Sequence, residues 1–248
     1  MTTDKVAVVT GAAAGIGAAC SVQLARKGIA IGVLDLDEER CADTLKAIAD
    51  AGGRAVALPA DVSNRQQVRA AVAKLRDTFG PVTIVVNNAG VTDFTPFEDV
   101  TEERFRFIYD VNVLGSIIVT QEVLPDMKAA KWGRVVNISS SSAQTGSSGM
   151  AIYSSSKGAI VALTRTLAQE LGPLGITVNN IPPGSIMGTI MSEANISPER
   201  AESLSKTLPV RRIGAPDDIA NACAWLCDEA SSYVTGQTIG VNGGRVVS

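Results

Sequence analysis

The 248-residue chain contains no histidine. This absence excludes Ser-His-Asp and Cys-His nucleophile systems and metal sites built on histidine. Cysteine is scarce: Cys20, Cys41, Cys223 and Cys227 show no C-x-x-C spacing, and the last two are spaced for one helix face beside Trp225. We therefore expect buried thiols rather than a metal or redox pair, in a reducing compartment.

The chain also has no basic block. Lys and Arg number 22 and Asp and Glu 25, so the net charge is −3, which argues against nucleic acid or an anionic membrane as the main partner. We expect no apolar run long enough to span a bilayer, and the N-terminus enters a strand-like segment without a signal-peptide pattern. The expected location is the cytoplasm.

What is present is a repeated alternation of strand and helix. With 46% hydrophobic and 19% charged residues, the composition is that of a globular protein with a well-filled core. Apolar, β-branched runs predict strands at Val6–Thr10, Ile29–Leu34, Ala55–Leu58, Thr83–Val86, Arg134–Ile138, Ile176–Ile181 and Thr238–Val241. The segments between them predict helices near 15–27, 37–51, 64–79, 101–130, 152–171 and 216–228. This order indicates right-handed crossovers and a parallel sheet.

Two architectures fit the alternation: an open, doubly wound α/β sheet and an eight-stranded α/β barrel. Seven strand candidates, with a glycine cluster directly after the first, favour the doubly wound, Rossmann-type sheet. No linker, repeat or composition shift divides the chain, so we expect a single domain over residues 1–248. Residues 185–209 break the alternation and are expected to form a substrate lid.

The glycine cluster Gly11-Ala-Ala-Ala-Gly15-Ile16-Gly17 follows the first strand and opens a helix. Glycines at this place let backbone N–H groups approach a pyrophosphate at the positive end of the helix. The spacing is G-x-x-x-G-x-G rather than the commoner G-x-G-x-x-G. We interpret the cluster as a dinucleotide site, the alternative being a plain tight turn.

Two carboxylates follow later strands. Asp35 closes the second strand, where it can accept both adenosine ribose hydroxyls and repel a 2′-phosphate. No Arg or Lys stands at Ala14 or Leu36, so NAD is favoured over NADP, unless Asp35 merely caps the next helix. Asp61-Val62 follows the third strand and marks either the adenine edge or a helix N-cap region.

Tyr153 and Lys157 are four residues apart within a predicted helix. Residues at this spacing share one helix face, so the ammonium would lie beside the phenol. A nearby cation favours the phenolate and lowers the tyrosine pKa toward the range of a useful acid or base. The alternative is a tyrosine packed on a lysine stem.

Taken together, the motifs resemble the short-chain dehydrogenase/reductase family over almost the entire chain. The motifs that carry this resemblance are Thr10–Gly17, Asp61-Val62, Asn87–Gly90, Asn112, Ser139–Ser142, Tyr153-x-x-x-Lys157, Pro183-Gly184 and Tyr233–Gln237. Jointly they are specific, although no one of them would be.

The resemblance implies four catalytic roles. Tyr153 would be the acid/base, and Ser140, thirteen positions before it, would polarise the substrate oxygen. Lys157 would lower the Tyr153 pKa and hold the nicotinamide ribose. Asn112 would order a water in a proton relay, unless it is simply a buried polar residue in a helix.

The resemblance also completes the cofactor site. Small residues after the fourth strand would pass the adenosine side, and a later segment would contact the nicotinamide carboxamide; these are Asn88, Ala89 and Gly90, then Pro183, Gly184 and Ile186. Where the family commonly has Thr, this chain has Gly188, and Thr189 stands one place later. Whether Thr189 replaces the usual contact is left open.

These roles predict hydride transfer between NAD(H) and a secondary alcohol or ketone. The expected substrate contacts are Ser142, Gln144 and Met187, with Thr92, Phe94, Met150 and Met191 nearby. This set is largely apolar and has no obvious cation, which favours a neutral cyclic or aryl substrate. No nucleic acid, membrane or metal is expected at the site.

Two other functions remain possible from sequence. One is a 3-oxoacyl thioester reductase acting on an acyl-carrier-protein or CoA substrate; Asp35 and the negative net charge weigh against it, whereas Lys131 and Arg134 leave it open. The other is a non-catalytic dinucleotide sensor, which would be expected to lose part of the Asn/Ser/Tyr/Lys set. The resemblance also predicts a homotetramer or homodimer through the helices of Asn112 and Tyr153, although core burial would equally explain the apolar stretch Ile160–Leu167.

Overall fold

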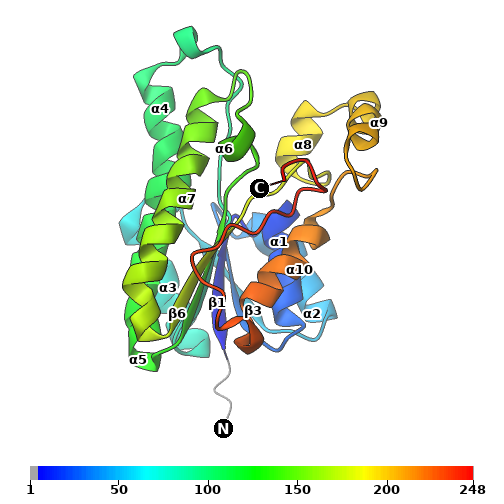
Figure 1. Cartoon of the computed structure of the whole chain (residues 1–248). Coiled ribbons are helices and arrows are strands. Elements are labelled where there is room, and N and C mark those ends of the chain that lie inside the picture. The colour runs from blue at the N-terminus through cyan, green and yellow to red at the C-terminus, as the bar shows by residue number, and fades with distance from the viewer. Residues whose placement is uncertain (1–4, 248) are drawn as a thin grey trace.

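Six parallel strands form one sheet in the order β3-β2-β1-β4-β5-β6 (Figure 1). The computed structural model describes residues 5–247, without the side chains of residues 194 and 195. The strands are β1 Val6–Thr10, β2 Ala30–Asp35, β3 Ala55–Pro59, β4 Ile84–Asn87, β5 Gly133–Ile138 and β6 Ile176–Ile181. This is the doubly wound, Rossmann-type α/β fold that the alternation predicted.

The prediction of a seventh strand at Thr238–Val241 is wrong. This segment runs parallel to β6 but forms only isolated bridges, one between Thr238 and Asn180 of β6 and one between Val241 and Pro183, which follows β6. Pro182 and Pro183 have no backbone N–H, so the pairing cannot continue as a regular ladder past the end of β6.

Helices cover both faces of the sheet (Figure 1). The chain order is α1 Gly15–Ala25, α2 Ala42–Asp50, α3 Arg65–Phe79, α4 Glu102–Tyr109, α5 Gly115–Ala130, α6 Ser142–Thr145, α7 Ala151–Leu171, α8 Ile190–Asn195, α9 Pro198–Thr207 and α10 Pro216–Leu226. Short 3₁₀ turns lie at Glu39–Cys41, Phe97–Asp99, Gly172–Leu174 and Glu229–Ser231.

Strand β1 is apolar from Val6 to Val9 because both faces of the sheet are covered by helices. Ala7 and Val9 belong to the core under α1, α2 and α10, whereas Val6 and Val8 belong to the core under α3, α5 and α7. Successive side chains of a strand point to opposite faces, so a strand with helices on both sides needs apolar residues at every position. The four cysteines are buried and free, as predicted.

The predicted helix over 101–130 is interrupted by a π-helical segment. Helix α4 leads into a π-helical segment, Asp110–Leu114, which contains Asn112, and α5 continues from Gly115. An inserted π-turn rotates the residues that follow it and is frequent at functional sites. The side chain of Asn112 is thereby turned toward Val91.

The same stretch corrects the expectation about apolar runs. Residues Glu102–Ala130 have a window with mean hydropathy 1.3, which by length and composition is enough to cross a membrane. Of that window 44% is buried, and Ile118, Val119 and Val123 belong to the core against the sheet. Packing on the sheet accounts for the apolar character.

The direction in which strands are added to the sheet changes between β1 and β4. From β1 the chain builds outward through β2 and β3, and from β4 it builds the other way through β5 and β6. Asn88, just after β4, ties the two strand ends together: its amide N–H donates to Thr10 Oγ1 at 3.0 Å, and its Nδ2 donates to the carbonyls of Thr10 and Gly11 at 2.9 and 3.0 Å. Ligands of open α/β sheets bind in the crevice at this point. Helices α8 and α9 rise beside it (Figure 1).

Candidate active site

A cavity of about 660 Å³ opens at the carboxyl ends of the strands. Most of the residues predicted for the cofactor lie on its wall: Gly11, Gly15, Ile16, Asp35, Asp61, Val62, Asn88, Ala89, Gly90, Pro183, Gly184 and Ile186. Ser140, Ser142, Tyr153 and Lys157 line it as well. The topology therefore brings together residues that follow all six strands with residues of α7.

The glycine loop forms a cradle that side chains would fill. Gly11 and Gly15 have φ angles of +61° and +56°, which favour glycine. A Cβ on Gly17 would lie 2.2 Å from the carbonyl oxygen of Gly11, so Gly17 supports the loop from behind rather than lining the cavity. No side chain caps the N-terminus of α1, so its N–H groups can receive a pyrophosphate.

Asp35 lies at the far end of this cradle. Its carboxylate accepts hydrogen bonds from the amides of Ala13 (3.1 Å) and Leu36 (2.9 Å), and Arg40 Nε lies 3.4 Å away. Neither bond caps the following helix, so the capping alternative is not observed. The NAD prediction considered Ala14 and Leu36 but missed Arg40, which also lines the cavity and partly offsets the Asp35 charge.

Asp61 and Val62 do not cap the following helix either. The cap of α3 is Asn64, whose side chain accepts from the amides of Gln66 and Gln67. Asp61 instead accepts from the amide and hydroxyl of Ser63 at 2.8 and 2.7 Å, directly before the helix. Both Asp61 and Val62 therefore remain available as wall residues of the adenosine end.

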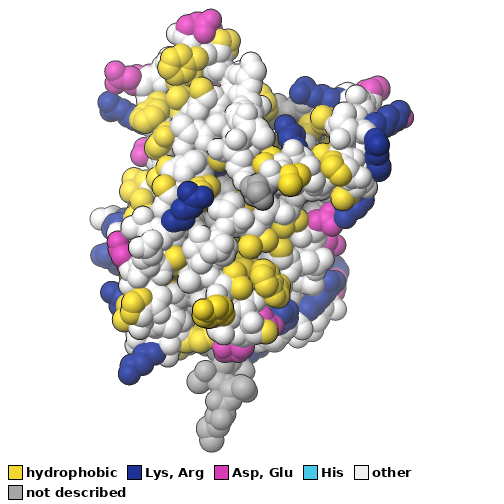
Figure 2. Space-filling view, in the orientation of Figure 1, with side chains coloured by type: hydrophobic (Ala, Val, Ile, Leu, Met, Phe, Trp, Pro, Cys, Tyr) yellow, Lys and Arg dark blue, Asp and Glu magenta, His cyan; other side chains and the backbone are white. Residues whose placement is uncertain are grey.

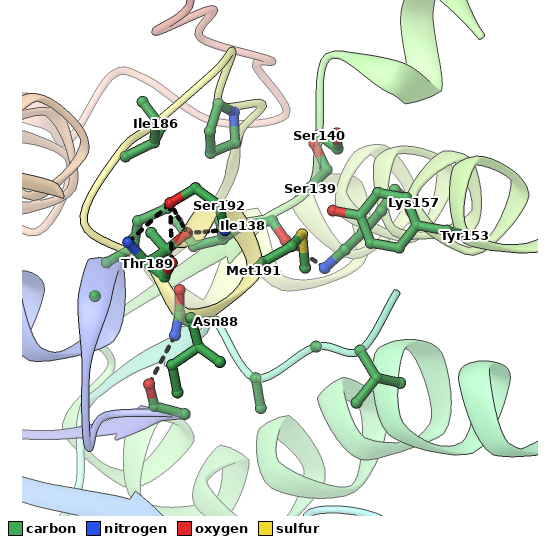
Figure 3. Close-up of a pocket in the computed structure, with 18 of the residues that line it drawn as sticks. Asn88, Ile138, Ser139, Ser140, Tyr153, Lys157, Ile186, Thr189, Met191 and Ser192 are labelled. Carbon is green, nitrogen blue, oxygen red and sulfur yellow. Dashed lines mark hydrogen bonds between the residues drawn. The ribbon is translucent and has the colours of Figure 1, made fainter. Parts of the chain in front are cut away.

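Tyr153 and Ser140 meet at the other end of the cavity (Figure 3). The Ser140 hydroxyl is hydrogen-bonded to the Tyr153 phenol. Ser142, at the start of α6, donates to Ser140 Oγ both from its amide (3.1 Å) and from its hydroxyl (2.9 Å). Because Ser140 Oγ accepts these two bonds, its single hydroxyl proton remains for another acceptor in the cavity.

Lys157 is buried beneath the tyrosine ring. Its Nζ donates to the Ile138 carbonyl at 3.0 Å and lies 5.8 Å from the Tyr153 ring centre (Figure 3). Burial lowers the pKa of Lys157 to about 8. An ammonium has three donors, and the Ile138 carbonyl takes one of them.

The predicted lowering of the Tyr153 pKa by Lys157 is not observed in the protein without a cofactor. Tyr153 is only 7% exposed, and this burial raises its pKa, while the hydrogen bond from Ser140 lowers it to a lesser extent. Desolvation penalises the phenolate more than its neighbours stabilise it. The phenol is therefore held in its protonated form at neutral pH.

Asn112 does not line the cavity; it holds one wall in place. Its Oδ1 accepts from the Val91 amide at 2.8 Å, and its Nδ2 donates to the Val91 carbonyl (2.9 Å) and Ser156 Oγ (3.0 Å). A Cβ on Gly90 would lie 3.1 Å from Lys157 Nζ and 3.3 Å from Asn112 Oδ1. The role of Asn112 in ordering a water stays a prediction.

Of the three predicted substrate contacts, only Ser142 lies on the cavity wall. Gln144 is exposed on α6. Ile186 pairs with Gly214 and lines the cavity, whereas its neighbour Met187, where the chain bends, is not on the wall. Phe94, Met150 and Met191 do line the cavity, whereas Thr92 does not.

Thr189 acts first as a helix cap. It forms a capping box with Ser192 at the start of α8, and its Cγ2 would be 3.2 Å from a Cβ on Gly15. Thr189 thus lies over the glycine loop (Figure 3). Whether it contacts the carboxamide stays open.

Besides Arg40, two further cations on the wall were missed from sequence, Arg200 on α9 and Arg245 near the C-terminus. The cavity wall thus contains cations that the expected substrate contacts lacked. Four-residue spacing between Arg200 and Leu204 was a signal for one shared helix face. Arg245 has no local signal, because only the tertiary fold brings the C-terminal segment to the cavity.

Comparison with known proteins agrees with this geometry. The family model described as "Enoyl-(Acyl carrier protein) reductase" matches residues 11–245. An uncharacterized oxidoreductase of Methylorubrum extorquens is 41% identical over 242 residues, 97% of each chain. A 7α-hydroxysteroid dehydrogenase solved with NADH and 7-oxo glycochenodeoxycholic acid has a TM-score of 0.93 at 36% identity, covering 99% of this chain and 96% of that one. An actinorhodin polyketide ketoreductase solved with NADPH has a TM-score of 0.92 at 32% identity, covering 97% of both.

The chain belongs to the short-chain dehydrogenase/reductase family. It is an oxidoreductase, and solved members of its family bind a nicotinamide dinucleotide. The glycine cradle, the open end of α1 and the Asp35 carboxylate on the cavity wall fit such a cofactor.

The buried ammonium makes stability depend on pH in a defined direction. The folded pKa of Lys157, about 8, lies below its ordinary value of 10.5. Between these pH values the unfolded chain binds more protons than the folded one, so stability rises with pH. We expect the unfolding free energy of the wild type to gain about 3 kcal/mol over this window relative to Lys157→Met, measured by urea titration.

The control for losing one positive charge is Lys46→Met, at an exposed position on α2. Parallel stability curves for the wild type and Lys157→Met would contradict the burial of a charged Lys157.

Proposed function

We propose that the protein interconverts a secondary alcohol and a ketone, with NAD(H) as the hydride carrier and Tyr153 as the acid/base. One observation carries the proposal: Ser140, Tyr153 and Lys157 converge in the same cavity as the glycine cradle. A bound nicotinamide dinucleotide supplies or accepts the hydride. The chain's own residues handle the proton and hold the two reactants.

In the reducing direction, Tyr153 donates its phenolic proton to the carbonyl oxygen as negative charge develops there. The raised pKa of Tyr153 keeps this proton in place at neutral pH. Ser140 is a second hydrogen-bond donor beside the same oxygen, oriented by the two bonds from Ser142. In the oxidising direction the same two groups work in reverse.

Lys157 has two tasks in this proposal. Its fixed cation stabilises the phenolate that remains after proton donation. The ammonium protons not used by the Ile138 carbonyl are the donors we assign to the nicotinamide ribose hydroxyls. Asn112 fixes the Val91 loop against α7, and its role in the water relay belongs to the proposal.

Replacing the acid/base tests the assignment directly. A positioned proton donor is worth about 10²–10⁴ in rate, so Tyr153→Phe should lose turnover by about that factor. NADH affinity, measured by fluorescence titration, should change little, because the ring and its packing remain.

The matched control is Tyr109→Phe. The Tyr109 hydroxyl donates to Ser155 Oγ at 3.1 Å on the outer side of α7, so this variant should keep wild-type turnover. Wild-type turnover in Tyr153→Phe would rule out the proposed role.

NAD is proposed over NADP because a 2′-phosphate would be repelled by the Asp35 carboxylate. The preference for NADH is expressed as the kcat/KM for NADH divided by the kcat/KM for NADPH. We expect Asp35→Ser to lower this ratio by about tenfold. Arg40→Gln removes the cation 3.4 Å from Asp35 and should raise the ratio. The exposed Asp37→Ser is the control for a lost negative charge.

The ratio is measured from initial rates at saturating ketone. A wild type that prefers NADPH, with a preference that falls in Arg40→Gln, would assign Arg40 to a phosphate and overturn the NAD proposal.

A 3-oxoacyl thioester reductase is the second candidate, favoured by the likeness to a 3-oxoacyl-[acyl-carrier-protein] reductase of Synechocystis, which is 35% identical over 247 residues. Of the two cations that left this possibility open, Arg134 is 1% exposed and packs on the Trp132 ring at 4.4 Å. A buried guanidinium is a poor docking point for an acidic carrier protein. A non-catalytic sensor is disfavoured because all four residues of the Asn/Ser/Tyr/Lys set are present.

The remaining parts of the proposal concern the surroundings of the site. We propose residues 185–209, which include α8 and α9, as the substrate lid within a single domain of residues 1–248. A homotetramer or homodimer is supported by two exposed apolar residues on the helical segments next to α7, Phe105 and Leu114. A cytoplasmic location stays a prediction.

A further inference from the structure

Two guanidinium groups line the substrate side of the cavity, and the proton-transfer mechanism uses neither. They are Arg200 on α9 and Arg245 beyond the last helix. Among the residues that the structure describes, neither arginine forms an ion pair. This contrasts with Arg40, Arg104 and Arg212, which all have carboxylate partners.

Arg245 is connected to the catalytic serine by a short series of contacts. Its Nη1 donates to Ser185 Oγ at 3.0 Å. Ser185 follows Pro183-Gly184, and the Pro183 carbonyl accepts from the amide of Ser141 at 2.9 Å. Ser141 is the neighbour of Ser140 in the chain. Arg245 therefore belongs to the end of the cavity where the alcohol or ketone would lie.

Arg200 occupies the cavity-facing side of α9. Leu204, four residues later on this helix, and Ile196, just before it, line the cavity with Arg200 between them. Most other side chains of α9 are polar and exposed, among them Glu202 and Lys206, which pair with each other at 2.7 Å. Arg200 and Arg245 are both exposed to solvent, but Arg200 lies between two apolar wall residues and so borders the cavity rather than the outer face of α9.

The charged residues on the cavity wall near Ser140 and Tyr153 are all positive. Its carboxylates, Asp35 and Asp61, both belong to the adenosine end, and the other charged residues on the wall are the cations Arg40, Lys157, Arg200 and Arg245. This positive end is found in a chain with a net charge of −3. Figure 2 shows Lys and Arg side chains gathered with apolar ones on the lobe formed by α8 and α9.

We infer that Arg200 and Arg245 bind an anionic group on the substrate, so that the substrate is an alcohol or ketone with an apolar body and a carboxylate or similar anion. Guanidinium groups suit carboxylates because they donate in pairs from one plane. The apolar body would contact Phe94, Met150 and Leu204 on the wall. This inference rests on the proposed function, because it concerns the substrate of the same site.

A binding experiment that needs no turnover tests it. The probes are 4-phenylbutyrate and its neutral analogue 4-phenylbutyramide, titrated into the protein saturated with NADH and followed by calorimetry. The anion should bind about tenfold more tightly than the amide, and its advantage should shrink as salt is raised. Arg200→Gln and Arg245→Gln should each remove most of that advantage.

Lys206→Gln is the matched control, because it removes a positive charge from the outer face of α9; it should leave both probes unchanged. NADH affinity should be unchanged in all three variants. Equal or absent binding of the two probes to the wild type would overturn the inference. A loss of NADH affinity in the arginine variants would also overturn it, by assigning the guanidiniums to the cofactor pyrophosphate. Failure of the proposed function is a separate result. It would be seen as unaltered turnover in Tyr153→Phe, which this binding experiment does not measure.

Discussion

The buried ammonium of Lys157 is the constraint on which the site depends. An isolated charge in a protein interior is costly, and here it is compensated by one hydrogen bond to the Ile138 carbonyl at the end of β5. That bond connects α7, which also packs on β6, to the carboxyl end of β5 beside Tyr153. The absence of a side chain at Gly90 leaves room for the ammonium, with Asn112 on the other side. One ion thus fixes the relative positions of a strand, a helix and a loop.

The same burial explains the chemistry of the pair. Without a cofactor, desolvation acts on both groups and favours their neutral forms: the pKa of Tyr153 is raised and that of Lys157 is lowered. A protonated phenol is what ketone reduction needs. Alcohol oxidation needs the phenolate, and this requires additional positive charge or better donors, which a positively charged oxidised nicotinamide beside the phenol would provide.

Much of the fold and of the reactive centre could be predicted from sequence, because both leave local signals. Continuous apolar strands between helices indicated a sheet covered on both faces, and the glycine cluster, Tyr153-x-x-x-Lys157 and the spacing to Ser140 carried the family resemblance. The seventh strand failed because Pro182 and Pro183 interrupt hydrogen bonding that apolarity alone suggested. The prediction of the substrate contacts failed for a different reason. Arg245 reaches the cavity wall only through tertiary folding, and the position of Met187 depends on the bridge between Ile186 and Gly214.

The central claim is that the Tyr153 phenol is a proton donor whose pKa is set by burial and reset by the cofactor. The chain has three tyrosines, so the tyrosinate absorbance of Tyr153 can be isolated by subtracting the Tyr153→Phe titration. The pKa of Tyr153 should lie above 10 in the free protein and fall when NAD⁺ is bound. A pKa below 10 in the free protein, or one that NAD⁺ leaves unchanged, would contradict the account.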